Sequence, residues 1–302
     1  MFPIIDFHVH VYPALPLSSE LKKVRSSLKS VLEPVSQLQH NAQSLIRKFP
    51  QFSRKFLEEI TTPSVIPHLL IESQFDDLIT EMNTHNVEKA VVIPHPPIIS
   101  NDFVYYECRK APNRLITSTF IDPQTMTKKE DLVAFYNQGV RIFKINPIQS
   151  GVPAEAPYYN DFLEYLNSKK AIVILHTGNI YSHLFKAPDK GDVKNFIPWF
   201  TRYPDIKFLL AHMNFNEPHR AIEQASLYEN VFLLTSWQPT DVIEKAINKV
   251  GVSKILFASD WPLLGGNILT QKNRILQLFK NKKISEQDLK NIFAENAKHL
   301  LA

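Results

Sequence analysis

The sequence is poor in cysteine and glycine. Its 302 residues contain one cysteine, Cys108, which excludes an internal disulfide and a cysteine-rich zinc site. There are seven glycines, and neither a G-x-G-x-x-G nor a Walker pattern is present, so nothing indicates a nucleotide site. The formal net charge of +4 is too small to indicate a nucleic-acid partner.

Signals for membranes and secretion are also missing. No stretch approaches the ~18–20 apolar residues that span a bilayer. The first residues lack the basic segment and the long apolar run of a signal peptide. We therefore expect a cytoplasmic protein without a membrane partner.

Eight short apolar runs recur along the chain. Several are apolar throughout rather than alternating, which is typical of strands buried on both faces. Between them, apolar residues at spacings of three and four predict helices over 74–86, 159–170 and 241–251. Two more helices are expected after the last run, and the second begins at Ser285 with Asp288 placed close to a capping box. The runs cover residues 4–9, 89–94, 115–121, 141–146, 171–177, 207–212, 231–236 and 254–260.

Eight strands that alternate with helices predict an α/β fold, a (β/α)8 TIM-like barrel, with an open doubly wound sheet as the alternative. We expect one domain over residues 1–302, with a helical insert at about 14–72 after the first strand. Within this insert, Ser18–Ile60 carries four more basic than acidic residues. Three roles stay open for it: a basic lid for an anionic substrate, the surface of a homodimer, or, as we prefer, a helix that packs on the barrel.

Two histidines end the first strand, in the stretch DFHVH. Residues i and i+2 of a strand project from the same face, about 7 Å apart, which suits two imidazoles that bind one metal ion. The fourth strand carries Lys144, and other polar residues end later strands: His176 the fifth, His212 the sixth and Asp260 the eighth. Active sites of such barrels lie at the C-terminal ends of the strands, so we expect these side chains to face one mouth.

The sequence resembles the amidohydrolase superfamily, in the amidohydrolase-related branch that includes aminocarboxymuconate semialdehyde decarboxylase-like enzymes. The matching segments occur in the family's order and cover nearly the whole chain. The resemblance implies a metal-dependent barrel enzyme. The segments are IIDFHVH, VEKAVVIP, PNRLITSTFIDP, VRIFKINP, VILHTG, YPDIKFLLAH, NVFLLTS, FASDWP and IFAENAKHLL.

The resemblance also implies roles for single residues. His8, His10 and His176 match metal ligands, and Asp260 matches the aspartate that binds metal and takes a proton from the metal-bound water. His212 matches an acid/base or substrate-polarising histidine. Neutral imidazoles with a carboxylate suit one divalent ion, for which we expect Zn²⁺, with Mn²⁺ as the alternative.

Lys144 is ambiguous: it could bridge two metals after carboxylation, bind a substrate carboxylate, or form a structural ion pair. Asn179, Trp237 and Trp261 follow strand ends and are further candidates for substrate contact. We assign loop roles to Tyr12 and His95. Asp6 has the same strand parity as His8, which favours a hydrogen bond to a metal ligand.

The expected function follows from this set of residues. We predict a hydrolase in which metal-activated water attacks a small carboxylate-bearing, lactone or amide substrate. The alternative is a metal-dependent, non-oxidative decarboxylase of a small unsaturated or aromatic acid. No arginine ends a strand to bind a carboxylate, which favours the hydrolase. A barrel without catalysis would show a broken ligand set, and the set is complete.

Overall fold

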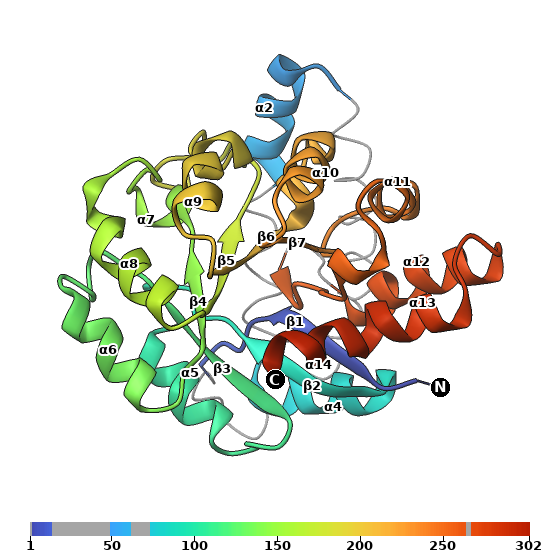
Figure 1. The fold of residues 1–302 in the computed structure, drawn as a ribbon, viewed down its shortest axis with the longest axis horizontal. Helices are drawn as coiled ribbons and strands as arrows, with labels where there is room; N and C mark the ends of the chain where they lie inside the picture. Colours follow the sequence, from blue (N-terminus) through green and yellow to red (C-terminus); the bar gives the residue numbers. More distant parts are fainter. Residues whose placement is uncertain (1, 14–48, 62–72, 264–266) are drawn as a thin grey trace.

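A barrel of eight parallel strands forms the centre of the molecule. The computed structural model describes residues 2–13, 49–61, 73–263 and 267–302. Each strand pairs with the next in chain order. A parallel bridge between Val9 and Trp261 and a hydrogen bond from Phe7 N to Phe257 O (3.0 Å) join the first strand to the last, so the sheet closes (Figure 1). The strands are β1 (Ile4–Val9), β2 (Val87–Val92), β3 (Leu115–Phe120), β4 (Ile142–Ile145), β5 (Ile172–His176), β6 (Lys207–Ala211), β7 (Val231–Leu234) and β8 (Ile255–Leu256).

Helices surround the strands, as Figure 1 shows. The predicted barrel is confirmed, and the doubly wound alternative is wrong because its sheet would have two open edges. Among the described residues, no helix is both long and apolar enough to cross a membrane. The helices after β1 are α2 (Gln51–Thr61), α4 (Phe75–His85), α5 (Asn101–Cys108), α6 (Lys129–Asn137), α7 (Pro147–Ser150), α8 (Asn160–Ser168), α9 (Ile197–Arg202), α10 (Pro218–Leu227), α11 (Thr240–Val250), α12 (Ile268–Lys280), α13 (Glu286–Lys290) and α14 (Asn296–Leu301).

The helix beginning at Ser285 has the capping box that the sequence indicates. The Ser285 side chain accepts a hydrogen bond from Asp288 N (3.1 Å), and the Asp288 carboxylate accepts one from Ser285 N (2.9 Å). These two bonds satisfy backbone donors at the start of α13. Of the predicted insert, residues 14–48 and 62–72 lie outside the described residues, and the described part contains α2.

Strand alternation divides the core into two layers. Side chains that point into the barrel form one cluster, which includes Ile142 on β4 together with Ile172 and Ile174 on β5. Their neighbours in sequence pack against the helices. Lys144 and His176 have the inward parity of these strands, so both point into the barrel near its mouth.

β1 departs from simple alternation. Ile5 and Phe7 belong to the inner cluster, whereas Val9 belongs to the outer one. The register between β1 and β2 shifts between Asp6 and Val9, and such irregularities redirect side chains. The inward positions therefore change from odd to even, which aims His8 inward. The predicted shared parity of Asp6 and His8 is wrong for this reason.

Candidate metal centre and its cavity

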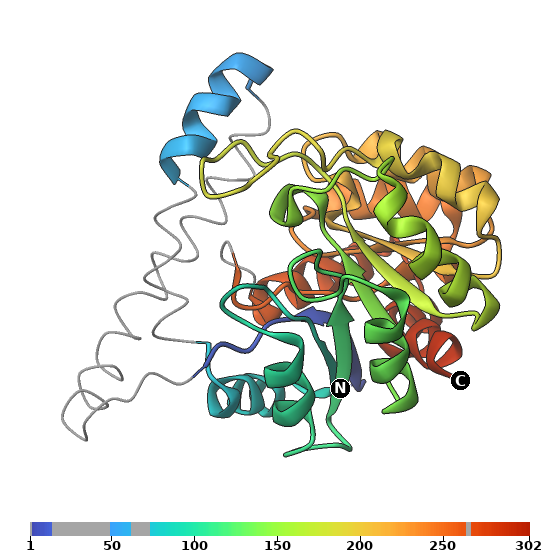
Figure 2. The ribbon, with the colours of Figure 1, turned by 90° about the vertical axis from the view of Figure 1, so that its left-hand side faces the viewer.

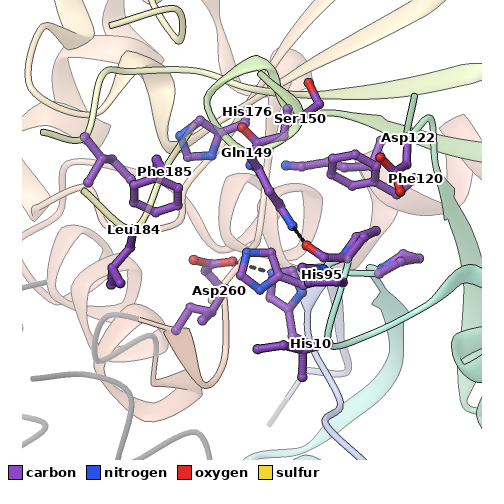
Figure 3. Close-up of a pocket in the computed structure, with 18 of the residues that line it drawn as sticks. His10, His95, Phe120, Asp122, Gln149, Ser150, His176, Leu184, Phe185 and Asp260 are labelled. Atoms are coloured by element: carbon purple, nitrogen blue, oxygen red, sulfur yellow. Dashed lines mark hydrogen bonds and ion pairs between the residues drawn. The ribbon is translucent and has the colours of Figure 1, made fainter. Parts of the chain in front are cut away.

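A cavity of about 300 Å³ opens at the C-terminal ends of the strands. The lining includes His8 from β1, His10 directly after β1, His176 from β5, His212 after β6 and Asp260 after β8. The walls around these polar groups are largely apolar. Figure 3 shows Leu184 and Phe185 on one side of the space and Phe120 on the other.

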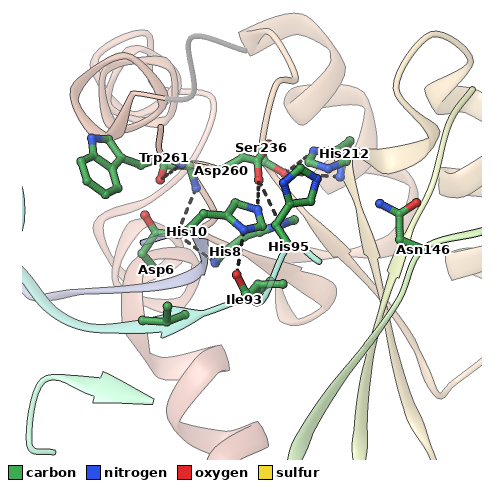
Figure 4. A network of polar contacts seen from close by, with 12 residues as sticks. Asp6, His8, His10, Ile93, His95, Asn146, His212, Ser236, Asp260 and Trp261 are labelled. Carbon is green, nitrogen blue, oxygen red and sulfur yellow. Dashed lines mark hydrogen bonds and ion pairs between the residues drawn. The ribbon is translucent and has the colours of Figure 1, made fainter. Parts of the chain in front are cut away.

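His8, His10 and Asp260 form the most compact part of the site. Their ligand atoms lie within 4.8 Å of one another, and all three side chains are buried. Asp260 Oδ1 lies 3.0 Å from His8 Nε2 and 3.2 Å from His10 Nε2 (Figure 4). His10 Nδ1 donates to Ile93 O (2.8 Å), which leaves Nε2 unprotonated and able to bind a metal.

His176 and His212 face the same space from the opposite strands. The His212 ring centroid lies 5.0 Å from that of His176 and 5.2 Å from that of His8. His176 stands outside the group whose ligand atoms lie within 4.8 Å. The His212 ring stacks on Trp237 at 3.8 Å, and its Nδ1 lies 2.9 Å from Ser236 Oγ.

The protonation states of the site suit metal binding. Burial lowers the pKa of His8 to about 3 and the pKa of His176 and His212 well below the ordinary value, so the imidazoles are neutral. Burial opposes ionisation of Asp260, but its interactions with the neighbouring His8, His212 and His10 outweigh this effect. The pKa of Asp260 therefore lies well below its usual range, and the group is a carboxylate.

Buried polar atoms without hydrogen-bond partners provide the test for a metal. In the part of the chain that the structure describes, His176 Nε2 and both carboxylate oxygens of Asp260 are such atoms. An unsatisfied buried polar atom costs about 1–3 kcal/mol, and more when the group is charged. A divalent cation would satisfy these atoms, so the residues fit the ion that the donor set predicts.

The backbone is strained where three strand ends meet the cavity. His212 (φ 61°), Trp237 (φ 63°) and Asp260 (φ 63°) all have left-handed conformations that non-glycine residues rarely adopt. Hydrogen bonds hold two of them, since Asp260 N donates to His8 O (2.8 Å) and the Gln238 amide donates to His212 O. Such strain costs on the order of 1–3 kcal/mol per residue and is concentrated at functional sites.

Lys144 is 3% exposed and lines the cavity. Its Nζ has no hydrogen-bond partner among the described residues, and no ion pair of Lys144 occurs there. The structural ion-pair interpretation therefore has no partner to support it. Burial lowers the pKa of Lys144 to about 7, and the charge of Asp260 opposes this shift.

The other candidates from the sequence separate into two groups. Trp237 lines the cavity and supports the His212 ring. Asn179 does not line it, and its side-chain oxygen accepts a hydrogen bond from Gly191 N (2.9 Å). Trp261 packs in the outer core beside β1 and also lies outside the cavity lining. Asp6 accepts hydrogen bonds from the backbone nitrogens of His8 (3.1 Å) and Ser259 (3.0 Å), not from a ligand imidazole.

Sequence reasoning missed Tyr12 and His95, which were assigned to loops. Both line the cavity, and Tyr12 Oη lies 3.1 Å from His95 Nδ1. A signal for His95 exists in the sequence, because Val91 and Ile93 point into the barrel and His95 continues that alternation. The PHPP context concealed it, since prolines normally indicate a loop.

The cavity wall after β5 is held from outside by α2. Glu58 on α2 is 1% exposed and accepts hydrogen bonds from Tyr181 N and the Asn216 side chain, both at 2.9 Å. The same loop continues to Leu184 and Phe185 in the cavity wall. Figure 2 shows α2 at the outer edge of the barrel beside this loop. The described part of the insert thus contacts the loop after β5 and Asn216.

Solved structures of low sequence identity share the fold. They include 5-carboxyvanillate decarboxylase LigW2 from Novosphingobium aromaticivorans with bound manganese (14% identity, 99% of this chain and 97% of that chain, TM-score 0.62). A probable 2-pyrone-4,6-dicarboxylic acid hydrolase from Acinetobacter baumannii matches with 14% identity, 96% and 98% coverage and a TM-score of 0.55. The 4-oxalomesaconate hydratase LigJ from Rhodopseudomonas palustris matches with 15% identity, 98% and 95% coverage and a TM-score of 0.59.

The family assignment depends on sequence. No curated protein matches the chain. The amidohydrolase family model matches residues 5–302, which include all of the barrel strands except the first residue of β1, and every residue of the candidate metal centre. The chain belongs to the amidohydrolase family.

Proposed function

We propose that the protein is a metal-dependent hydrolase of a small carboxylate-bearing, lactone or amide substrate. The observation that carries the proposal is the buried group of His8, His10 and Asp260, in which the Asp260 carboxylate oxygens lack hydrogen-bond partners among the described residues. A structural carboxylate at this depth would normally be fully hydrogen-bonded. This one is held at the floor of an open cavity by two imidazoles.

His8, His10, His176 and Asp260 would hold one divalent ion, and Zn²⁺ suits this donor set, with Mn²⁺ as the alternative. When bound, such an ion supplies Lewis acidity and lowers the pKa of water to about 7. Four ligands of these types leave a charge of +1 on the ion and its ligands, which favours an anionic substrate.

Asp260 is the proton acceptor in this proposal. As the water oxygen adds to the substrate carbonyl carbon, the Asp260 carboxylate takes the water proton. It then returns the proton to the departing oxygen or nitrogen, and the bond between that atom and the carbonyl carbon breaks. The low pKa of Asp260 keeps the group ionised, so a carboxylate oxygen is free of a proton before the reaction begins.

His212 polarises the carbonyl oxygen. Ser236 Oγ accepts from His212 N (3.3 Å) and lies 2.9 Å from His212 Nδ1, and in this proposal its hydroxyl proton is donated to Nδ1. This arrangement leaves a proton on Nε2, where it can be donated to the oxygen that gains negative charge. The stacked Trp237 ring fixes the orientation of the imidazole.

The cavity indicates the substrate class. Its volume of about 300 Å³ suits a small molecule, and its apolar walls suit a hydrocarbon or ring portion. Lys144, buried in the lining with no partner in the described regions, would bind a substrate carboxylate. With a pKa near 7, this amine becomes fully charged when an anion arrives beside it.

A decarboxylase is the second candidate, favoured by the largely apolar walls of the cavity. A carboxylate is destabilised in such surroundings, and its loss as CO2 relieves that cost. The bond from carbon to the carboxylate breaks, its electron pair stays on carbon, and a solvent proton reaches that carbon through His212 or Asp260. The cavity lining that the structure describes contains no arginine to bind the carboxylate of a decarboxylase substrate. We therefore prefer hydrolysis to decarboxylation.

One experiment separates the two reactions. Purified protein loaded with Zn²⁺, and separately with Mn²⁺, is incubated with panels of lactones, amides and small unsaturated or aromatic acids in ¹⁸O-labelled water. Hydrolysis places ¹⁸O in the product carboxylate, whereas decarboxylation releases CO2 and leaves the product unlabelled. Release of CO2 without label would replace the hydrolase by the decarboxylase. Asp260→Asn is the control, because it removes the proton acceptor.

A further inference from the structure

His95 is held firmly at the cavity although it lies in a loop. Its backbone N–H donates to Ile99 O and its carbonyl accepts from Ile99 N, both at 3.0 Å, so residues 95–99 form a closed turn. The Gln149 side chain on α7 donates to Pro96 O and ties this turn to the next part of the wall. Gln149 itself lines the cavity. The position of His95 is therefore fixed from two elements.

Tyr12 fixes the ring. Its Oη lies 3.1 Å from His95 Nδ1, which is its one side-chain hydrogen-bond partner in the described parts of the chain. Tyr12 is 5% exposed, and its hydroxyl can donate one hydrogen bond. When this hydroxyl donates to Nδ1, that nitrogen carries no proton of its own. His95 is left with its proton on Nε2, a neutral tautomer that can donate one hydrogen bond.

His95 is separate from the metal-binding group. Its ring centroid lies 5.6 Å from that of His10, and it is not among the residues whose ligand atoms cluster within 4.8 Å. A metal-binding imidazole needs an unprotonated nitrogen, and the Tyr12 contact uses Nδ1. Nε2, which has no partner among the described residues, is the remaining polar atom of a ring that lines the cavity.

We propose that His95 is a substrate-binding residue that donates a hydrogen bond from Nε2 to an oxygen of the substrate, and that Tyr12 is the positioning residue that fixes its tautomer. This inference rests on the proposed function, because it assigns the donor to the same cavity. It specifies the substrate further: besides the reacting carbonyl near His212, the molecule carries a second acceptor oxygen toward β2. A carboxylate, lactone or hydroxyl oxygen fits this requirement.

The first test is the tautomer. Zn²⁺-loaded protein with ¹⁵N-labelled histidine is examined by two-bond ¹H–¹⁵N correlation spectra, and His95 is assigned from the signals that disappear in His95→Gln. We expect the shift pattern of an unprotonated Nδ1 and a protonated Nε2. In Tyr12→Phe this preference is lost while the other histidine signals stay. A protonated Nδ1 in the wild type overturns the inference.

The second test uses benzoate, a carboxylate probe with an apolar ring suited to the walls. His95→Leu removes the donor, whereas His95→Gln places an amide N–H near the position of Nε2. We expect about tenfold weaker benzoate binding by His95→Leu, as for one lost hydrogen bond to a charged acceptor, and recovery to within about threefold in His95→Gln. Unchanged affinity in His95→Leu overturns the proposal.

Metal content separates this inference from the proposed function. All the His95 and Tyr12 variants should keep the wild-type amount of Zn²⁺, and loss of Zn²⁺ in His95→Gln would make His95 a ligand and overturn the inference. Neither the tautomer nor benzoate binding requires turnover. Failure to find hydrolysis therefore leaves these results intact, and failure of these tests leaves metal-dependent hydrolysis intact.

Discussion

The two sides of the cavity are built differently. On the β1 and β8 side, His8, His10 and Asp260 are buried in the barrel, and backbone hydrogen bonds between the two strand ends hold them. On the opposite side, the wall after β5 is a loop whose position depends on Glu58 of α2, far away in sequence. The barrel therefore fixes the reacting groups, whereas a helix distant in sequence shapes the space for the substrate.

Replacing Asp260 should have the largest effect. Asp260→Asn loses the proton acceptor and a charged metal ligand, so we expect activity to fall by about 10²–10⁴-fold with loss of bound metal. Elemental analysis and steady-state rates measure both. Asp189→Asn, an exposed change in the loop after β5, is the control and should match the wild type. An Asp260→Asn protein with full activity would contradict the claim that the reacting groups lie at the ends of β1 and β8.

His212 should matter for rate more than for binding. His212→Ala removes the donor to the developing negative charge, and we expect kcat to fall by about 10²–10³-fold with metal content preserved. Ser236→Ala, which only frees the His212 tautomer, should cost about 10–100-fold. A change confined to KM in His212→Ala would show that the residue binds substrate rather than polarising it.

Replacing Lys144 should weaken carboxylate binding and, near pH 7, stabilise the folded protein. Its pKa of about 7 lies below the ordinary 10.5, so between these values the unfolded chain binds more protons and stability rises with pH. Lys144→Met should weaken carboxylate binding about tenfold or more and keep the metal. In metal-free protein, the stability advantage of the variant should be largest near pH 7 and shrink toward pH 10.5, as measured by urea unfolding. An advantage that grows with pH would contradict this.

Glu58 tests the loop side of the comparison, with its neighbour Glu59 as a matched control. Glu58→Ala leaves Tyr181 N and the Asn216 amide without their acceptor, so we expect KM to rise about three- to tenfold while kcat and metal content stay unchanged. Faster hydrogen exchange should be confined to the loop after β5. Glu59 pairs with the exposed His183, and Glu59→Ala should have little effect. Equal effects of the two variants on KM would contradict a specific role of Glu58 in holding the loop after β5.

The smallest effect is expected at Asn179. It follows His176 closely in sequence but faces Gly191 instead of the cavity. We expect Asn179→Ala to change KM less than about twofold, with a modest loss of stability of about 1 kcal/mol from the broken hydrogen bond. A large rise in KM would restore the substrate contact that the sequence suggested.

The barrel and most of the polar residues at its C-terminal end could be predicted from the sequence. Each strand appears as a short apolar run that can be recognised without knowledge of its neighbours. The run that contains Lys144 and the run that ends at His176 have uniform alternation, so the inward residues follow from parity. The same reasoning fails at β1, where the register shift with β2 is a property of two strands rather than one. Asp6 was misplaced for that reason.

The less predictable residues depend on contacts between distant segments. Tyr12 and His95 meet across 83 positions, and Glu58 reaches Tyr181 across 123. Neither pair has a spacing that a single sequence can reveal, and the prolines around His95 suggested a loop without function. Asn179 and Trp261 were suggested because they follow strand ends, but a residue after a strand can face either way.

The most direct test of the account is the metal content of the purified full chain, with His8→Ala and Lys144→Ala beside the wild type. The account predicts about one divalent ion per chain, lost in His8→Ala and kept in Lys144→Ala. About two ions per chain, one of them lost with Lys144, would contradict the single-ion centre. No metal in any of the three proteins, and none taken up from added Zn²⁺ or Mn²⁺, would contradict the central claim.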